Sequence, residues 1–447
     1  MKHKKKMLTL MAATALVFVA ACGGNNGNNA GSTASSSSNA GASASASTDS
    51  DSGKPVTIRL AWWGGDTRHE YTKKVVDMYE AQHKNVTIEV EYANYDDYWK
   101  KIAPQAAAGE LPDIIQIDTS YYSQYAGKKQ LADLTPFFGK EIDVSNISDN
   151  ALKAGEYGSG NYGMNLGVNS LGFQYVPETL NKAGIDSIPD NWTWDDYVNM
   201  AAKAKQAGIY IDDGFRPEIF FAYYLRTKGA TLYNADGNGL GYDDDSLFVD
   251  YFGRIADVTK SGAAPSADVK AQIKGVEDGF TVKGQQIGVW QWSNQYDALQ
   301  KAVNKPMEIA PMVGPDMEKG LYLKPSMFFS IAESSKVKSE AAKFINFWVN
   351  DVEANKLILG ERGVPVSSTV QEAIKPLLSP AQQQVFDYVS WSEQHSSPMD
   401  PVDPVGSAEI IDKLKTLSEQ LEYNQISVED AAKSFRADAT SILSKNK

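Results

Sequence analysis

Two short segments of the chain place tryptophans among small and polar residues. One reads WWGGD at residues 62–66, and the other reads VWQWSN at residues 289–294. A hydrophobic core uses large apolar side chains but rarely sets two tryptophans beside Gly, Asp, Ser and Asn. Indole faces stack on the C–H faces of sugar rings, while carboxylate, amide and guanidinium groups hydrogen-bond the hydroxyls. Both segments therefore favour a carbohydrate-binding site.

Strand geometry limits how many of these rings can reach a ligand. Neighbouring side chains of a strand point to opposite faces, so one ring of an adjacent pair belongs to the core. We expect Trp62 to be that core residue, and we expect Trp63, Trp290 and Trp292 to face a cleft.

A third tryptophan pair has a structural explanation. Trp192 and Trp194 lie in the sequence NWTWDD, around Thr193. A threonine followed by acidic residues is typical of a helix N-terminus, because its hydroxyl accepts a hydrogen bond from a free N–H of the first turn. We therefore predict a capped helix here, with both tryptophans as packing residues.

No motif of an enzyme active site occurs in the sequence. Neither G-x-S-x-G, H-E-x-x-H nor a Walker loop is found, so we predict no catalytic residue and no enzyme. The 56 acidic residues nevertheless offer many carboxylate pairs, and only their separation in space identifies a glycosidase. A surface glycosidase or lyase stays open as the alternative, and so does an adhesin or peptide receptor.

Charge and residue counts argue against other classes. The 447 residues carry a formal net charge of −13, whereas nucleic-acid binding needs clustered Lys and Arg. One cysteine and four histidines exclude a disulfide scaffold and a thiolate cluster, and they argue against a histidine-rich metal site. We predict no metal, no cofactor and no nucleic-acid partner.

Residues 1–22 have the pattern of an export signal. Lysines at the start precede an apolar segment, residues 7–19, that is too short to cross a bilayer. The following VAAC sequence resembles the lipobox of bacterial lipoproteins, in which the cysteine takes a diacylglycerol. Cys22 is thus the predicted lipidation site, and it would anchor the protein to the membrane.

Residues 23–53 are predicted to form a disordered tether. They are mostly Ser, Gly, Ala and Asn, with no apolar residue larger than alanine. Such a segment cannot bury enough surface to offset the entropy cost of ordering. As a flexible coil it would span about 30 Å.

From residue 54 onward the pattern alternates between strands and helices. Short runs of β-branched and apolar residues predict strands, and apolar residues three or four apart predict helices. This order predicts an α/β fold with a parallel sheet covered by helices on both faces. Predicted strands are 56–62, 86–92 and 113–117, and predicted helices are 70–82, 96–108, 121–129, 339–349 and 428–442.

The loops after these strands contain candidate polar contacts. Ligands of such sheets bind beyond the carboxyl ends of the strands, which here are the loops at 62–68 and 118–122 and the one after Met164. An acidic sugar would meet Arg68 or Arg362 in a bidentate pair. The other loop candidates are Asp66, Asp118 and Tyr121.

Further motifs make the chain similar to a known family. With the lipobox, the tether and WWGGD, they resemble the extracellular solute-binding proteins of carbohydrate ABC importers, the maltose-binding-protein-like family. The resemblance covers residues 54–447. The motifs are LPDII at 111–115, WTWDD at 192–196, WQWSN at 290–294 and GVPV at 363–366.

Three segments are similar to a narrower subgroup, which is associated with pectin fragments. They are RLAWWGG at 59–65, KPSM at 324–327 and GERGVP at 360–365. In particular, the chain resembles the binding protein of a Gram-positive rhamnogalacturonan-oligosaccharide importer.

The resemblance implies a two-lobed, periplasmic-binding-protein-like fold of type II, with a three-segment hinge and a central ligand cleft. Lobe 1 would contain residues 54–166 and 322–350, and lobe 2 residues 167–321 and 351–447. It also implies an oligosaccharide ligand, ABC permease subunits as partners, a monomer, and a position on the extracellular face of a Gram-positive-type cell membrane.

The resemblance further implies roles for individual residues. Trp290 matches a sugar-stacking tryptophan, and Glu218 and Phe220 match another sugar-contacting segment. Asn169 matches a hinge position where maltose-binding relatives use a carboxylate. The amide changes the hydrogen-bond pattern and argues against maltose as the ligand.

Overall fold

A computed structural model of the chain describes residues 54–273, 278–401 and 403–446. The predictions of a signal peptide, a lipidated Cys22 and a tether fall outside the described residues. Within the described part, no helix is long and apolar enough to span a membrane.

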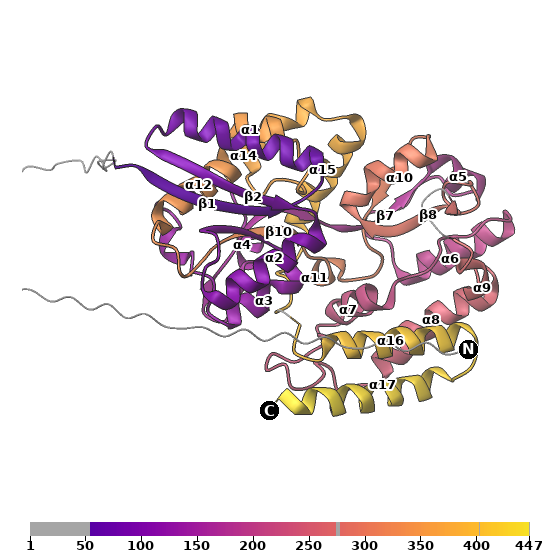
Figure 1. Cartoon of the computed structure of the whole chain (residues 1–447). Helices are drawn as coiled ribbons and strands as arrows, with labels where there is room; N and C mark the ends of the chain where they lie inside the picture. The colour runs from indigo at the N-terminus through magenta and orange to yellow at the C-terminus, as the bar shows by residue number, and fades with distance from the viewer. Residues whose placement is uncertain (1–53, 274–277, 402, 447) are drawn as a thin grey trace, which may run out of the picture. The chain divides into compact units, whose positions relative to one another are not determined.

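The first lobe is built on a five-stranded sheet with the order β2-β1-β3-β10-β6 (Figure 1). β1 runs parallel to β2 and β3, as the sequence predicts. β10 is antiparallel to both β3 and β6, so the expectation of an all-parallel sheet is wrong for half of the sheet. The strands are β1 (Val56–Trp63), β2 (Val86–Ala93), β3 (Ile114–Ile117), β6 (Met164–Asn169) and β10 (Lys324–Ile331).

Helices pack around this sheet where the apolar periodicity places them. In α2, Asn94 caps the first turn by accepting a hydrogen bond from Asp97 N, and Gly109 ends the helix with a φ of 72°. Glycine suits that position because it adopts positive φ without a steric penalty. The helices of this lobe are α1 (Asp66–Gln82), α2 (Tyr95–Ala108), α3 (Thr119–Gly127), α4 (Asp149–Lys153), α12 (Lys338–Asn350), α13 (Val352–Ile358) and α14 (Ser368–Ile374).

The second lobe is built on a smaller antiparallel sheet with the order β8-β7-β9. Its strands are β7 (Leu171–Tyr175), β8 (Gly288–Trp292) and β9 (Glu308–Ala310). Its helices are α5 (Pro177–Lys182), α6 (Trp194–Gln206), α7 (Pro217–Thr227), α8 (Ser246–Ser261), α9 (Ala267–Lys270), α10 (Tyr296–Val303), α11 (Met317–Gly320), α16 (Ser407–Glu422) and α17 (Val428–Leu443).

The predicted cap at Thr193 is confirmed. Its side chain accepts from Asp196 N while the Asp196 carboxylate accepts from Thr193 N, which is a complete capping box. Trp192 and Trp194 are both buried in the core of the second lobe, as expected for packing residues.

The chain passes between the two hydrophobic cores three times. Val168 packs in the first core and Leu171 in the second, while Leu321 packs in the second and Leu323 in the first. The third passage uses α15 (Pro380–Gln394), which contributes Phe386 to the first core and contacts α10 and β9. The first two passages lie close to the expected hinge positions.

The third passage differs from the expectation. We expected lobe 2 to resume at residue 351, but Ala354, Ile358, Val370 and Ile374 all pack in the first core. Packing on the second lobe resumes in α15, where Trp391 lies against the second core, and continues from Ile410 onward. The reason is tertiary: α13 and α14 bury their apolar faces against α1 and α12, a pairing that motif order does not reveal.

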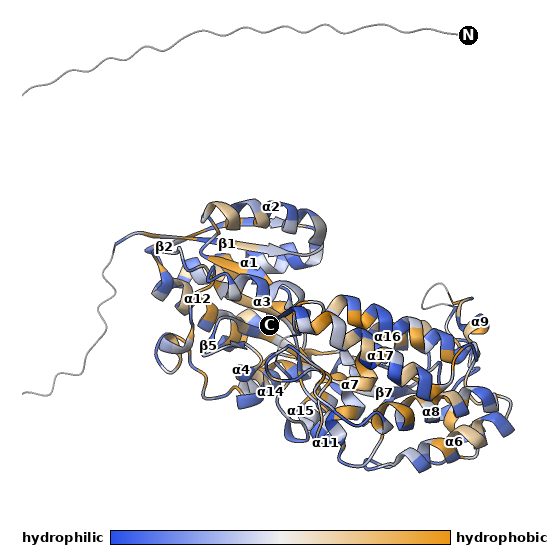
Figure 2. Cartoon of the chain, turned by 90° about the horizontal axis from the view of Figure 1, so that it is seen from below, coloured by the Kyte–Doolittle hydropathy of each residue, from blue (hydrophilic) through white to orange (hydrophobic). Residues whose placement is uncertain are grey.

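The C-terminal helices α16 and α17 complete the second lobe. They pack against each other and against α7 and α8, far from them in sequence (Figure 1). Hydrophobic and hydrophilic bands follow both helices (Figure 2). In α16, Ile410, Leu414, Leu417 and Leu421 form the buried stripe, with the spacing of an amphipathic helix.

Candidate ligand-binding cleft

A cavity of about 550 Å³ lies between the two lobes. One side is formed by Arg68 and residues 118–120, which follow the carboxyl ends of β1 and β3, as the sequence predicts for this fold. Residues 292–295, at the end of β8, form the opposite side. The rest of the lining consists of Asn169, Asp297, residues 324–327 and 359–364, Gln382, Val385 and Phe386.

Four of the ten predicted ligand contacts line this cavity. They are Arg68, Asp118, Asn169 and Trp292, of which Trp292 is only 8% exposed and also packs in the second core. The other six are Trp63, Asp66, Tyr121, Glu218, Phe220 and Trp290, and none of them is part of the cavity lining.

Trp63 and Tyr121 lie in an aromatic cluster of the first lobe. The Trp63 ring is only 7% exposed and packs against Tyr98 and Trp99. Tyr121 stacks on Trp99 with ring centroids 3.9 Å apart. Trp62 is fully buried, as expected, but Trp63 is buried as well because helices cover both faces of the sheet. Asp66 is exposed in the first turn of α1.

Trp290 lies inside the second core. It is 2% exposed, and its indole N–H donates to Asp212 Oδ2 at 2.7 Å. Its ring stacks on Trp192 and Phe215. Phe220 is also buried against it. Trp290 therefore presents no open stacking face in this conformation, and its contact with a ligand stays a prediction.

Three acidic residues of this region, Asp212, Asp213 and Glu218, are at least partly buried. Asp212 is buried and accepts from Tyr197 OH as well as from Trp290. The neighbouring Asp213 has its pKa raised to about 7, first by burial and then by repulsion from Asp212. Glu218, the predicted contact on α7, is half-buried and lies 3.8 Å from Lys415 Nζ.

Arg68 is already paired inside the cavity. Its guanidinium donates to both carboxylate oxygens of Glu361, at 2.9 Å for the shortest contacts. Tyr71 OH donates to the same carboxylate at 2.5 Å. The charge of Arg68 is therefore largely neutralised before any ligand arrives.

Arg362 is held in a cage behind the cavity wall. It is 1% exposed and donates to Tyr71 OH at 2.7 Å and to Gln116 Oε1 at 3.1 Å. Its guanidinium also lies 4.7 Å from the centroid of the Trp348 ring. Burial lowers its pKa to about 10. The expectation that Arg362 reaches a ligand carboxylate does not fit this packing.

The segment that carries Arg362 crosses very close to β6. A Cβ atom added to Gly167 would lie 2.4 Å from the carbonyl oxygen of Arg362, so only glycine fits there. Val364 pairs with Val168 in an isolated bridge. This contact fixes residues 359–364 as a wall of the cavity.

Two amides of β6 have unused hydrogen-bonding capacity. In the described part of the chain, neither Asn169 Oδ1 nor Asn165 Nδ2 has a hydrogen-bond partner, although both atoms are buried. A buried polar atom without a partner carries a desolvation cost, which a ligand group at the same place would relieve. Asn169 lies in the cavity lining, but its Oδ1 is closed to solvent in this conformation, so a ligand would reach it only after a local rearrangement.

Sequence reasoning missed Lys324 as a site residue. It begins β10, directly across from Asn169 in the sheet register, and it lines the cavity. Its ammonium lies 5.1 Å from the centroid of the Trp292 ring. Burial lowers the pKa of Lys324, while nearby Asp118 raises it and Arg216 lowers it. The only sequence signal was that KPSM forms part of a family motif.

The three carboxylates of the cavity are engaged with neighbouring groups. Glu361 binds Arg68, Asp118 caps α3 by accepting from Ser120 N, and Asp297 pairs with Lys301. Within the described residues, no group of three His, Cys, Asp or Glu is placed to hold a metal ion.

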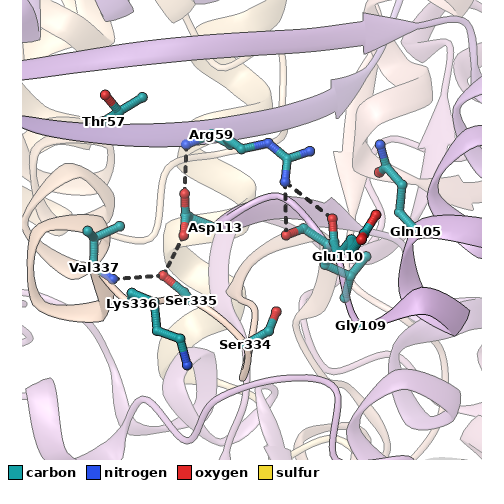
Figure 3. A pocket seen from close by; sticks show the side chains of 11 residues that line it. Thr57, Arg59, Gln105, Gly109, Glu110, Asp113, Ser334, Ser335, Lys336 and Val337 are labelled. Carbon is teal, nitrogen blue, oxygen red and sulfur yellow. Dashed lines mark hydrogen bonds between the residues drawn. The ribbon is translucent and has the colours of Figure 1, made fainter. Parts of the chain in front are cut away.

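A second pocket, of about 420 Å³, lies at the amino ends of β1 and β3 (Figure 3). Its polar groups bind one another. Asp113 accepts from Arg59 N and from Ser335 Oγ, while the Arg59 guanidinium donates to Glu110 O and to Glu91. Arg59 and Asp113 are therefore engaged, while Gln105 Oε1, also in the lining, is buried without a partner among the described residues.

Comparison with known proteins identifies the class to which this fold and cleft belong. Residues 74–382 match the family described as bacterial extracellular solute-binding protein, and the chain belongs to this family. A putative binding protein of Brucella abortus is 23% identical over 310 residues, which cover 66% of this chain and 72% of that protein.

Solved structures show the same fold. An extracellular solute-binding protein of family 1 from Alicyclobacillus acidocaldarius is 29% identical, with a TM-score of 0.78 over 88% of this chain and 99% of that one. A periplasmic oligogalacturonide-binding protein from Yersinia enterocolitica is 21% identical, with a TM-score of 0.76 over 88% and 100%. A cyclic α-maltosyl-1,6-maltose-binding protein from Arthrobacter globiformis is 19% identical, with a TM-score of 0.70 over 88% and 100%.

Proposed function

We propose that the protein captures an oligosaccharide, specifically a pectin or rhamnogalacturonan fragment, and delivers it to the permease of an ABC importer. The observation that carries this proposal is the cavity between the lobes, which combines an indole ring, Trp292, with the unsatisfied amide of Asn169. Aromatic rings and planar amides are the groups that bind the faces and hydroxyls of sugars.

Binding and delivery would be coupled through hinge closure. A ligand that touches Arg68 or Asp118 on one side and Trp292 on the other binds the closed form more tightly than the open form. This differential affinity shifts the population toward the closed form. The permease subunits would recognise that form, and the protein would act as a monomer.

The N-terminal region would hold the protein at the cell surface. Lipidation at Cys22 and the tether of residues 23–53 would anchor it to the outer face of the cell membrane. A single lipid chain binds membranes only marginally, whereas two chains hold a protein stably. Metabolic labelling with a fatty-acid analogue tests this, because Cys22→Ser should abolish the label.

A thermal-shift panel tests the ligand class. The purified protein is melted with maltose and with xylo-, arabino-, galacturono- and rhamnogalacturonan oligosaccharides. A ligand that binds only the folded state raises Tm. At a ligand concentration of a hundred times Kd, it adds about 2.7 kcal/mol to the free energy of unfolding. We expect the rhamnogalacturonan fragments to give the largest shift. No shift with any carbohydrate would contradict the proposal.

A further inference from the structure

The cavity contains a cation with no carboxylate bound to it. Lys324 is half-buried, and in the described part of the chain no ion pair joins its ammonium to an acidic group. Asp118 is near enough to affect its pKa, but it is committed to the N-terminus of α3. A partly desolvated ammonium in this situation gains free energy from any anion that reaches it.

Lys324 lies beside two other groups that suit a sugar. Its ammonium is 5.1 Å from the centroid of the Trp292 indole, and Asn169 is its direct partner in the sheet register. The Asn169 Oδ1 acceptor is buried without a partner among the described residues. An aromatic ring, a cation and a free acceptor thus meet at one end of the cavity.

The two arginines of the cavity lining cannot take the same role. Arg68 is neutralised by Glu361, and Arg362 is enclosed by Tyr71, Gln116 and Trp348. An incoming carboxylate would have to displace an existing ion pair in the first case and to enter the core in the second. Lys324 requires neither change.

We propose that Lys324 is the specificity-determining residue of the cleft and that it binds the carboxylate of a hexuronate ring packed against Trp292. This inference rests on the proposed function and narrows its ligand class. A hexuronate carries its carboxylate at the edge of a ring whose faces present C–H groups. The Lys324 ammonium already lies over the Trp292 ring, so the uronate ring would meet the ammonium with its carboxylate edge and the indole only where it is open to the cavity.

Two variants of Lys324 separate its charge from its packing. Lys324→Met keeps the aliphatic stem and removes the charge, whereas Lys324→Arg keeps the charge. Lys336→Met is the matched control, because Lys336 is an exposed lysine beyond the other end of β10 and lines the second pocket. The probes are trigalacturonate and the uncharged galactotriose of the same linkage, measured by calorimetry at low and high salt.

We expect Lys324→Met to weaken trigalacturonate binding at least tenfold and to reduce its dependence on salt. Lys324→Arg should stay within about threefold of the parent protein, and Lys336→Met should match it. Melting curves of the unliganded variants report whether each one is folded.

Three results would overturn the inference. In the first, Lys324→Met folds normally and binds trigalacturonate as tightly as the parent. In the second, the parent binds galactotriose or another uncharged sugar but not trigalacturonate or rhamnogalacturonan fragments, so the proposed function survives while the uronate assignment fails. In the third, the parent binds no carbohydrate, and both proposals fail.

Discussion

The two ends of the first sheet both carry charged and polar side chains, but they differ in whether the charged groups have partners. At the amino ends of β1 and β3, Asp113 accepts hydrogen bonds from Arg59 N and Ser335 Oγ (Figure 3). The Arg59 guanidinium also pairs with Glu91. At the opposite end, Lys324 has no ion pair and Asn169 Oδ1 has no partner among the described residues. The ends therefore differ in their charges: Arg59 and Asp113 are engaged at the amino end, where only the neutral Gln105 Oε1 is buried without a partner among the described residues, whereas the Lys324 ammonium has no ion pair.

This difference separates a pocket that supports the fold from a cleft that can bind. Polar groups that already bind each other gain little from a ligand, because new contacts only replace existing ones. Unsatisfied groups cost stability in the free protein and regain it on binding. The cleft nevertheless contains self-satisfied groups as well, in the network of Arg68, Glu361 and Arg362, and this mixture can be tested.

The largest expected effect is a loss of stability when the enclosed side chain of Arg362 is removed. Arg362→Ala removes a buried side chain and leaves Gln116 Oε1 without its donor, so it should lower the free energy of unfolding by about 4 kcal/mol. Chemical denaturation measures this change. Arg362→Met, which refills most of the volume, should lose less. Equal stability of Arg362→Ala and the parent would contradict the view that this network supports the cavity wall.

A carboxyl group of the second lobe, that of Asp213, should make the stability of the protein depend on pH. The pKa of Asp213 is about 7 in the folded protein and ordinarily 3.8, so between these values the folded state holds a proton that the unfolded state has lost. The free energy of unfolding therefore falls as pH rises from about 4 to 7. Asp213→Asn should be more stable than the parent by about 4 kcal/mol at pH 8 and equal to it at pH 4.

Melting curves across this pH range check the prediction. Asp195→Asn is the control, because the Asp195 side chain is 90% exposed and its removal should not change the pH profile. Parallel profiles for Asp213→Asn and the parent would show that Asp213 is not the group responsible.

A moderate effect is expected on affinity, from the indole ring of the cleft. Trp292→Ala should raise the Kd for the best oligosaccharide of the panel at least tenfold, because the sugar loses its stacking surface. Calorimetry measures the loss. Trp391→Ala is the matched control: Trp391 is half-buried against Tyr388 on α15 and does not line the cavity. Equal losses in both variants would remove the special role of Trp292.

The smallest effect is expected at the amino end of the sheet. Arg59→Met breaks a partly exposed ion pair, and such pairs contribute about 0–1 kcal/mol. We expect a small loss of stability and an unchanged Kd for the same oligosaccharide. A clear loss of affinity would mean that this pocket communicates with the cleft and would break the comparison between the two ends.

The sequence predicted the local structure well because local patterns determine it. β-branched and apolar content identified β1, alternation identified β2, and the TWDD motif identified the N-terminus of α6. The antiparallel insertion of β10 was missed because its partners β3 and β6 lie more than 150 residues earlier, and no local pattern encodes that pairing. The placement of α13 and α14 in the first core was missed for the same reason.

The site was predicted in part, and the failures share one cause. Arg68, Asp118, Asn169 and Trp292 lie in the cavity lining because strand ends and motif order place them there, and their contact with a ligand stays a prediction. The sequence could not show that Trp290 turns inward to Asp212, nor that Lys324 lacks an acidic partner. Burial and missing partners depend on tertiary contacts, which residue types and spacing do not specify.

The three passages of the chain between the cores also determine the order in which the protein can fold. The first core needs residues up to Val389 in addition to its early strands, and the second needs Ile410 to Leu443. Synthesis proceeds from the N-terminus, so neither lobe can complete its core until nearly the whole chain has been made. Contacts so distant in sequence form slowly. This delay leaves the newly made chain incompletely folded for longer than a chain whose lobes are each continuous in sequence.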